Sequence, residues 1–170
     1  RVDLPLILMG YINPVLQYGL ERFLAKAAAL GIDGLILPDL PMYEYENLYR
    51  ETFEAHGLHN IFLITPQTSE ERIRQIDAVS RGFIYVVSTA ATTGRTEGFG
   101  SEQANYFQRV QAMGLQNPCL IGFGIHDHTT YRQAADHAAG AIIGSAFIKA
   151  VSQEGPLAEK IEGFVKRIRG

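Results

Sequence analysis

The chain has 170 residues, of which 46% are hydrophobic and 19% are charged, and its formal net charge is −3 at pH 7. This composition is typical of a globular protein with a core, and the slight acidity argues against a nucleic-acid-binding or membrane-surface protein, which would need a basic face. The lone cysteine, Cys119, excludes an internal disulfide and favours a reducing compartment, the cytoplasm. No apolar run approaches the ~18 residues of a membrane span.

Short apolar runs alternate with helical patterns along the whole chain. Buried strands are expected at 4–11, 34–38, 61–65, 82–88, 118–123 and 141–144. Helices are expected at 14–30, 43–56, from about 70 onward, 101–113, 127–138 and 145–151, and another after 156. Strands that alternate with helices in this way form βαβ units and a parallel sheet. The repeat of roughly 25 residues is close to that of a βα barrel, which has ~250 residues in eight units, so the sequence predicts about six of them.

Local signals indicate where several elements begin. Asn13 and Pro14 are expected to be the N-cap and the first residue of the first helix. Asp127 also stands where a helix needs an N-cap, so we interpret His126-Asp-His128 as a helix start and not as a metal site, because no third ligand is evident. The first strand is an uninterrupted apolar run and is expected to be buried on both faces.

Two glycine-containing strand ends stand out in the last third of the chain. Leu120–Gly124 and Ala141–Ser145 each combine an apolar strand with a glycine at the point where a helix should begin. Unpaired amides in the first turn of a helix, together with the helix dipole, attract anions. In βα barrels the phosphate site lies after strands seven and eight, at a short extra helix, and residues 145–151 have the right length for it. The sequence therefore predicts a phosphate cradle at these two ends.

Six segments carry a family resemblance: Leu8–Pro14, Gly31–Pro41, Ile61–Pro66, Thr93–Gly94, Gly122–Ile125 and Gly144–Ala146. In order and spacing they resemble the tryptophan synthase alpha subunit. The motif Leu-Pro-Asp-Leu-Pro followed by Gly-Phe-Gly-Ile is specific for this family, whereas other phosphate-binding barrels share only the glycine-rich strand ends.

The resemblance implies a TIM (β/α)8 barrel of tryptophan biosynthesis, a lyase that cleaves indole-3-glycerol phosphate to indole and glyceraldehyde 3-phosphate. Indole would pass to the beta subunit of an alpha2-beta2 complex, which carries the pyridoxal phosphate, so no cofactor is expected in this chain. Residues 1–170 would be a single domain, the C-terminal three-quarters of the barrel from its third strand onward. The catalytic glutamate and aspartate of the family would precede Arg1, so we expect this segment alone to be inactive.

The resemblance also implies roles for individual residues. Substrate binding is expected at Tyr11, Ile36, Tyr85, Thr93, Phe123 and Ile143, with Met9 as a further pocket wall. Phosphate binding is expected at Gly94, Gly122, Gly124, Gly144 and Ser145, and a partner interface at Asn13, Asp39 and Pro41. Tyr85 and Thr93 would support catalysis, the latter by orienting the missing aspartate. Ala91 replaces the usual glycine of the loop Thr89–Gly100.

Simpler roles remain open for some of these residues. In these alternatives, Tyr85 only packs inside the barrel, Asn13 only caps its helix, and Asp39 only makes a hydrogen bond within its loop. Other functions also remain: a stand-alone indole-glycerol-phosphate lyase without a beta partner, or a non-catalytic module that binds phosphate or a partner. Two unpaired edge strands, near Leu6–Tyr11 and Ala141–Gly144, would expose backbone groups, so the sequence predicts self-association of the truncated barrel.

Overall fold

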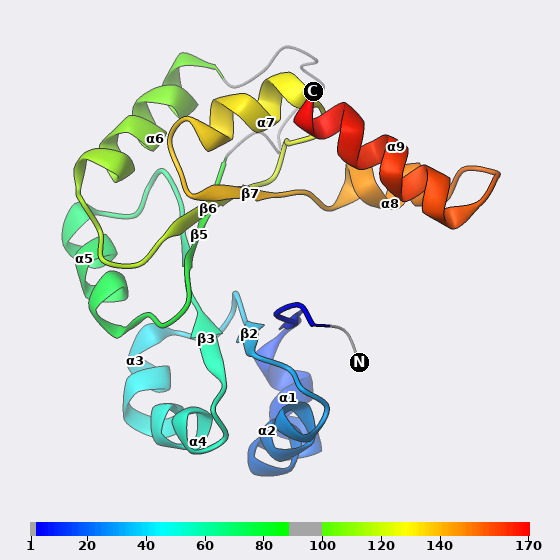
Figure 1. The fold of residues 1–170 in the computed structure, drawn as a ribbon. Coiled ribbons are helices and arrows are strands. Elements are labelled where there is room, and N and C mark those ends of the chain that lie inside the picture. Colours follow the sequence, from blue (N-terminus) through cyan, green and yellow to red (C-terminus); the bar gives the residue numbers. More distant parts are fainter. Residues whose placement is uncertain (1–2, 89–99) are drawn as a thin grey trace.

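A computed structural model describes residues 3–88 and 100–170 (Figure 1). Its strands are β1 Ile7–Met9, β2 Gly34–Ile36, β3 His59–Ile61, β4 Leu63–Ile64, β5 Ile84–Val87, β6 Cys119–Gly122 and β7 Gly140–Ile142. Its helices are α1 Ile12–Tyr18, α2 Leu20–Ala29, α3 Met42–Glu44, the π-helix η1 Tyr45–Tyr49, α4 Arg50–Ala55, α5 Glu70–Val79, α6 Ser101–Ala112, α7 His128–Ala135, α8 Ser145–Val151 and α9 Leu157–Arg169.

The described strands all run parallel, in two groups with the orders β1-β2-β3 and β4-β5-β6-β7. Phe62 joins the groups, because its carbonyl accepts a hydrogen bond of 2.9 Å from the Tyr85 amide on β5. The strands therefore follow one arc, with helices on its outer side (Figure 1). This is the expected alternation of strand and helix. In residues 3–88 and 100–170, no helix is long and apolar enough to cross a membrane.

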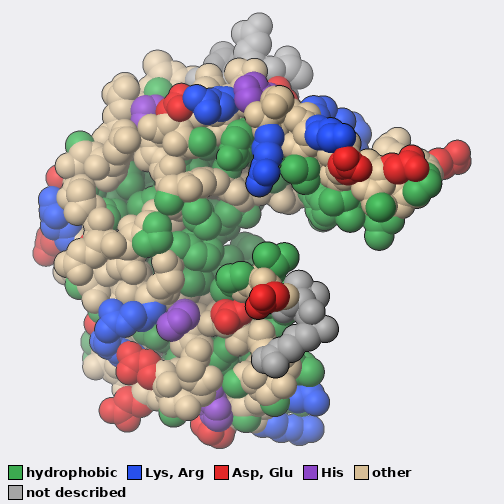
Figure 2. Space-filling model, viewed as in Figure 1, with side chains coloured by type: hydrophobic (Ala, Val, Ile, Leu, Met, Phe, Trp, Pro, Cys, Tyr) green, Lys and Arg blue, Asp and Glu red, His purple; other side chains and the backbone are tan. Residues whose placement is uncertain are grey.

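The sheet separates two apolar clusters, because successive side chains of a strand point to opposite faces. Leu35 of β2 belongs to the larger cluster, between strands and helices, and its neighbour Ile36 belongs to the smaller one. The smaller cluster consists of Ile36, Ile61 and Tyr85 on the inner face of the arc. Figure 2 shows apolar side chains gathered on this inner wall.

A close contact between two strands fixes the inner face. The ring and hydroxyl of Tyr85 on β5 lie directly over the Cα of Gly122 on β6, and a Cβ at that glycine would overlap the tyrosine. Tyr85 is 4% exposed. Gly122 is therefore required at this position by space, since no side chain fits beneath the tyrosine.

Several boundaries differ from those expected. β1 is not buried on both faces: Leu8 and Met9 are 42% and 56% exposed, because β1 pairs only with β2 among the described strands. The strand expected at 61–65 is divided where pairing changes from β2 to β5. The expected first helix is two helices, since Gly19 has a φ of 96° that is incompatible with a continuous helix.

The expected N-cap at Asn13 is wrong. Tyr11 is the N-cap of α1 and has no side-chain cap bond, and Asn13 lies inside the helix. The first-turn amide of Ile12 instead donates to Asp39 Oδ1, 2.9 Å away in the loop after β2. A carboxylate is well placed at a helix N-terminus, where unpaired amides and the dipole favour negative charge. Asp39 thus joins the loops after β1 and β2.

The cap predicted at Asp127 is confirmed. Its side chain accepts from the Thr130 amide at 2.8 Å, and Thr130 completes a capping box by accepting from the Asp127 amide. In the described part of the chain, no group of three or more potential metal ligands occurs. Ser69 caps α5 by accepting from the Arg72 amide, and Glu70 and Glu71 lie in the first turn of this helix.

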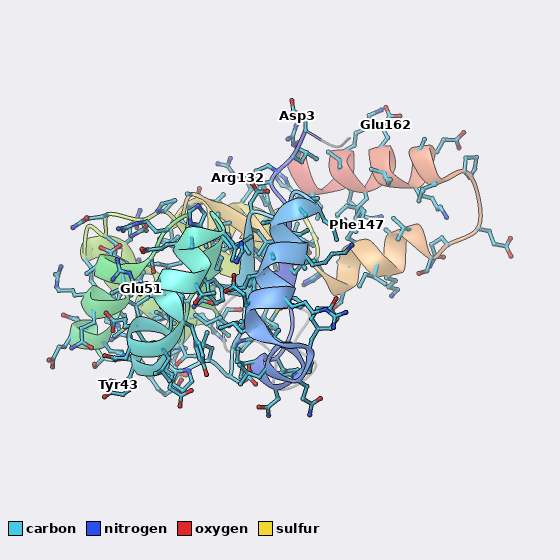
Figure 3. All side chains as sticks on the ribbon, turned by 90° about the horizontal axis from the view of Figure 1, so that it is seen from below. Asp3, Tyr43, Glu51, Arg132, Phe147 and Glu162 are labelled. Atoms are coloured by element: carbon cyan, nitrogen blue, oxygen red, sulfur yellow. The ribbon has the colours of Figure 1, made fainter. Side chains whose placement is uncertain are left out.

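The last two helices form an arm at one end of the arc. Figure 3 shows α8 and α9 projecting side by side, and Phe147 of α8 packs edge-on against Phe164 of α9 with ring centroids 5.4 Å apart. The predicted short helix 145–151 has the predicted bounds. Lys166 and Arg169 lie in the last turn of α9, where positive charge complements the helix dipole.

Loss of the Asp39 cap should destabilise the chain. Asp39→Ala should lower the free energy of unfolding by about 1 kcal/mol, because the Ile12 amide loses its acceptor. Asp39→Asn keeps an acceptor oxygen and should stay within about 0.5 kcal/mol of the parent. Urea denaturation measures both, and equal stability of the alanine and asparagine variants would contradict the cap.

Gly122 should not tolerate a methyl group. Gly122→Ala should cost about 1–3 kcal/mol, because the new Cβ must displace the buried Tyr85. Gly163 in α9 is a matched control, since a Cβ there meets nothing within 4 Å. Gly163→Ala should instead stabilise the helix by up to about 1 kcal/mol. Thermal denaturation of both variants measures these changes in stability. An unchanged stability of Gly122→Ala would refute the contact between Tyr85 and Gly122.

Candidate functional site

The inner face carries an aromatic pair at the end of two strands. Tyr85 on β5 and Phe123, the first residue after β6, have ring centroids 5.8 Å apart, inclined by 50°. Phe123 is 43% exposed, whereas Tyr85 is buried. Ile36 belongs to the same cluster as Tyr85. Of these three side chains only Phe123 is exposed, and its ring extends the buried apolar cluster to the surface.

The Tyr85 hydroxyl stays protonated at neutral pH. Burial raises its pKa above the ordinary value of 10.0. It is therefore a hydrogen-bond donor and does not act as a base near pH 7.

The turn after β6 has an unusual backbone. Phe123 has a φ of 70° and Gly124 a φ of 76°, so two consecutive residues adopt the left-handed region. Glycine accepts this conformation without strain, but phenylalanine does not. Behind the turn lies Ser88, whose hydroxyl donates to the carbonyls of Gly122 at 3.1 Å and Phe123 at 2.7 Å. Ser88 was missed in the sequence, because no local pattern links it to residues more than thirty positions away.

The second predicted strand end lies on the neighbouring strand. β7 pairs with β6, and Gly144 and Ser145 follow it as the N-cap and first residue of α8. Both residues are exposed. The Gly144 carbonyl accepts from the amides of Phe147 and Ile148 at 3.0 and 3.1 Å, whereas the amides of Ser145 and Ala146 have no acceptor within the helix. Adjacent pairing thus brings the two predicted glycine ends to one edge of the sheet.

The assignment of Ile143 to the pocket wall needs correction. Ile143 packs against the larger cluster on the helix side of the sheet, and its neighbour Ile142 packs against the Tyr85 cluster. Successive residues face opposite sides, so a shift by one position moves the side chain to the other face. Ile142 is therefore the isoleucine on the side of Tyr85. Met9, which pairs with Ile36, is largely exposed at the edge.

The predicted interface residues gather at the same ends of the first strands. Tyr11 caps α1, Pro41 caps α3, and Asp39 bonds to the Ile12 amide between them. Tyr11 is 67% exposed, and Asn13, Asp39 and Pro41 are exposed as well. A shallow hollow of about 210 Å³ adjoins Pro41 and is also lined by Met42 and Arg72. Thr93, Gly94 and Ala91 lie outside the described residues.

Two other features lie away from this site. Burial raises the pKa of the half-buried Cys119 thiol to about 11, so the group is not a nucleophile at neutral pH. The hollow beside Cys119, of about 300 Å³, is lined by Asn117, Pro118 and Ala138. It lies where β6 begins, at the opposite end of the strand from the glycine turn.

Comparison with known proteins gives a consistent result. The family model for the tryptophan synthase alpha chain matches residues 1–168. The tryptophan synthase alpha chain of Christiangramia forsetii is 55% identical over 169 residues, which are 99% of this chain and 65% of that protein. The tryptophan synthase alpha chain of Flavobacterium psychrophilum is 57% identical over 167 residues, 98% of this chain and 65% of that protein.

Solved structures agree. A mutant tryptophan synthase alpha-subunit from the hyperthermophile Pyrococcus furiosus matches with a TM-score of 0.84 at 30% identity. The match covers 99% of this chain and 67% of the Pyrococcus furiosus chain. Tryptophan synthase subunit alpha from Campylobacter jejuni matches with a TM-score of 0.84 at 27% identity, and the match covers 99% of this chain and 66% of that chain. The arc of βα units is thus part of a TIM barrel, and the chain spans about 65% of the length of the curated relatives it matches. On these grounds the chain belongs to the tryptophan synthase alpha chain family.

Proposed function

We propose that this chain provides the substrate-holding part of the site at which indole-3-glycerol phosphate is cleaved to indole and glyceraldehyde 3-phosphate. One observation carries the proposal: the aromatic pair Tyr85 and Phe123 adjoins two glycine turns on neighbouring strands. An apolar ring surface beside unpaired backbone amides suits a ligand that has an aromatic ring at one end and a phosphate at the other. The family is one of lyases in tryptophan biosynthesis, and pyridoxal phosphate belongs to its beta subunit.

The proposed roles follow the position of each residue. Tyr85, Phe123, Ile36 and Tyr11 would surround the indole ring, with Ile142 in place of Ile143. The amides near Gly122, Gly124, Gly144 and Ser145 would hold the phosphate. Gly94 would add a further amide and Thr93 would orient the catalytic aspartate, as the family resemblance implies for these two residues.

The reaction needs groups that we do not assign to this chain. Cleavage of the carbon–carbon bond requires an acid that protonates the indole ring, a carboxylate that holds the indole N–H, and removal of a hydroxyl proton. Asp39 stands at the end of a strand, but its carboxylate already accepts from the Ile12 amide. We therefore propose that the glutamate and aspartate of the family act from outside residues 1–170, and that these residues alone do not turn over substrate.

The same reasoning suggests a partner. The exposed residues Asn13, Asp39 and Pro41 would contact the beta subunit of an alpha2-beta2 complex, and the Asp39 bond would connect that surface to the loop after β1. We further propose that residues 1–170 are one domain and that the protein is cytoplasmic, as its lone cysteine favours.

A chimera tests the catalytic proposal. The chain alone should release no indole from indole-3-glycerol phosphate. Joined to the part of the Christiangramia forsetii relative that lies outside the match, it should release indole, because that part would supply the carboxylates. Tyr85→Ala in the chimera should lower kcat/KM by at least about tenfold through loss of ring contact, whereas the distant Cys119→Ala should leave it nearly unchanged. Activity in the chain alone, or none in the chimera, would count against the proposal.

Self-association is expected for the 170-residue chain. β1 and β7 each pair on one side only among the described strands, and Leu8 and Met9 are exposed beside the β1 edge. Unpaired strand edges invite pairing with a second copy. Sedimentation at tens of micromolar should show dimers or larger species, and Leu8→Lys should reduce them, because a charged side chain opposes pairing at an edge. A monodisperse monomer would refute this expectation.

A further inference from the structure

A buried hydroxyl lies behind the turn after β6. Ser88 follows β5 directly and is 1% exposed. Its amide donates to the Gly122 carbonyl at 3.1 Å, and its hydroxyl lies within hydrogen-bond distance of two carbonyls, that of Gly122 at 3.1 Å and that of Phe123 at 2.7 Å. The hydroxyl has one proton, which these two carbonyls share. Ser88 therefore holds two successive peptide groups of the turn from its buried side.

These contacts fix the direction of two amides. In a trans peptide group the C=O and the following N–H point in opposite directions. When the carbonyls of Gly122 and Phe123 point toward buried Ser88, the amides of Phe123 and Gly124 must point away from it. The Phe123 amide points toward the paired strand β7 and lies in the ladder between β6 and β7. Gly124 follows that ladder and is exposed, so its amide is open to an approaching ligand.

The backbone needs such an anchor. Phe123 is the one non-glycine residue with a positive φ in the described part of the chain, at 70°. An L-residue with a Cβ disfavours this conformation, so surrounding contacts must hold it in place. The contact of Tyr85 with the Cα of Gly122 fixes the turn from the inner face, and Ser88 fixes it from the buried face.

We propose that Ser88 is the positioning residue of the phosphate turn: it holds the carbonyls of Gly122 and Phe123 and so presents the amide of Gly124 to the phosphate of the substrate. This inference rests on the proposed function, because it assigns the anion to that site. Ser88 does not contact the ligand. It acts through the backbone that does.

A second serine offers a matched control. Ser80 is also 1% exposed, and its hydroxyl donates to the Ile76 carbonyl at 2.7 Å, the same distance as from Ser88 to Phe123. Ser80 closes the end of α5 and does not belong to the glycine turns. Each alanine variant loses one buried hydroxyl donor, that of Ser80 to the Ile76 carbonyl and that of Ser88 to the carbonyls of Gly122 and Phe123. Both variants should therefore lose thermal stability to a similar degree.

The experiment measures the rise in melting temperature that inorganic phosphate produces at constant ionic strength, with chloride as the reference anion. An anion that binds only the folded chain raises the melting temperature with concentration. The parent and Ser80→Ala should show this rise. Ser88→Ala should need on the order of tenfold more phosphate for the same rise, because the Gly124 amide is no longer held toward the anion. Ser88→Thr, which keeps the hydroxyl, should restore the parent response, and Ser88→Cys, a weaker donor of similar size, should lie between them.

The outcomes separate the two claims. If phosphate does not stabilise the parent, the proposed phosphate site is wrong and the role of Ser88 is wrong with it. If the parent responds and Ser88→Ala responds equally, the site stands and the positioning role is refuted. Residual dipolar couplings of the Gly124 amide give an independent readout. They should change in Ser88→Ala and not in Ser80→Ala, and unchanged couplings in both would also refute the role.

Discussion

The parallel direction of the strands is the constraint on which this site depends. Each described strand ends at the same edge of the sheet, so residues that follow β5, β6 and β7 meet there although β5 and β7 end more than fifty positions apart in the sequence. Pairing of β5 with β6 and of β6 with β7 places Tyr85, the Gly122–Gly124 turn and Gly144 in adjacent positions. The site therefore depends on the pairing register of the strands, because the register brings these side chains to adjacent positions.

Within that frame, one turn is held from two directions. Tyr85 occupies the space above the Cα of Gly122, and Ser88 holds the carbonyls of Gly122 and Phe123 from behind. The left-handed backbone of Phe123 turns its ring toward Tyr85. An exposed ring and a directed amide, that of Gly124, therefore arise from the same few residues, which links the aromatic and anionic ends of the proposed ligand.

The sequence predicted what depends on local signals. The bounds of α8 and the cap at Asp127 follow from short patterns of glycine, polar and apolar residues, and both are confirmed. Prediction from the sequence failed where contacts with distant parts of the chain determine the structure. β1 is exposed because it pairs on one side only among the described strands, and α1 is capped by Asp39 from another loop instead of by Asn13. Ile143 was placed on the wrong face of the sheet. Successive side chains alternate between the two faces, so an error of one position reverses the assignment.

The most direct test of the account is to map two simple ligands separately on the backbone amides by NMR. Indole should shift signals near Ile36, Tyr85 and Phe123, and inorganic phosphate should shift those near Gly124 and Ser145, because the two ends of the proposed substrate contact adjacent surfaces. If phosphate instead shifts residues beside Cys119, or if indole binds only the apolar hollow near Leu8 and Phe23, the aromatic pair and the glycine turns do not form one substrate site.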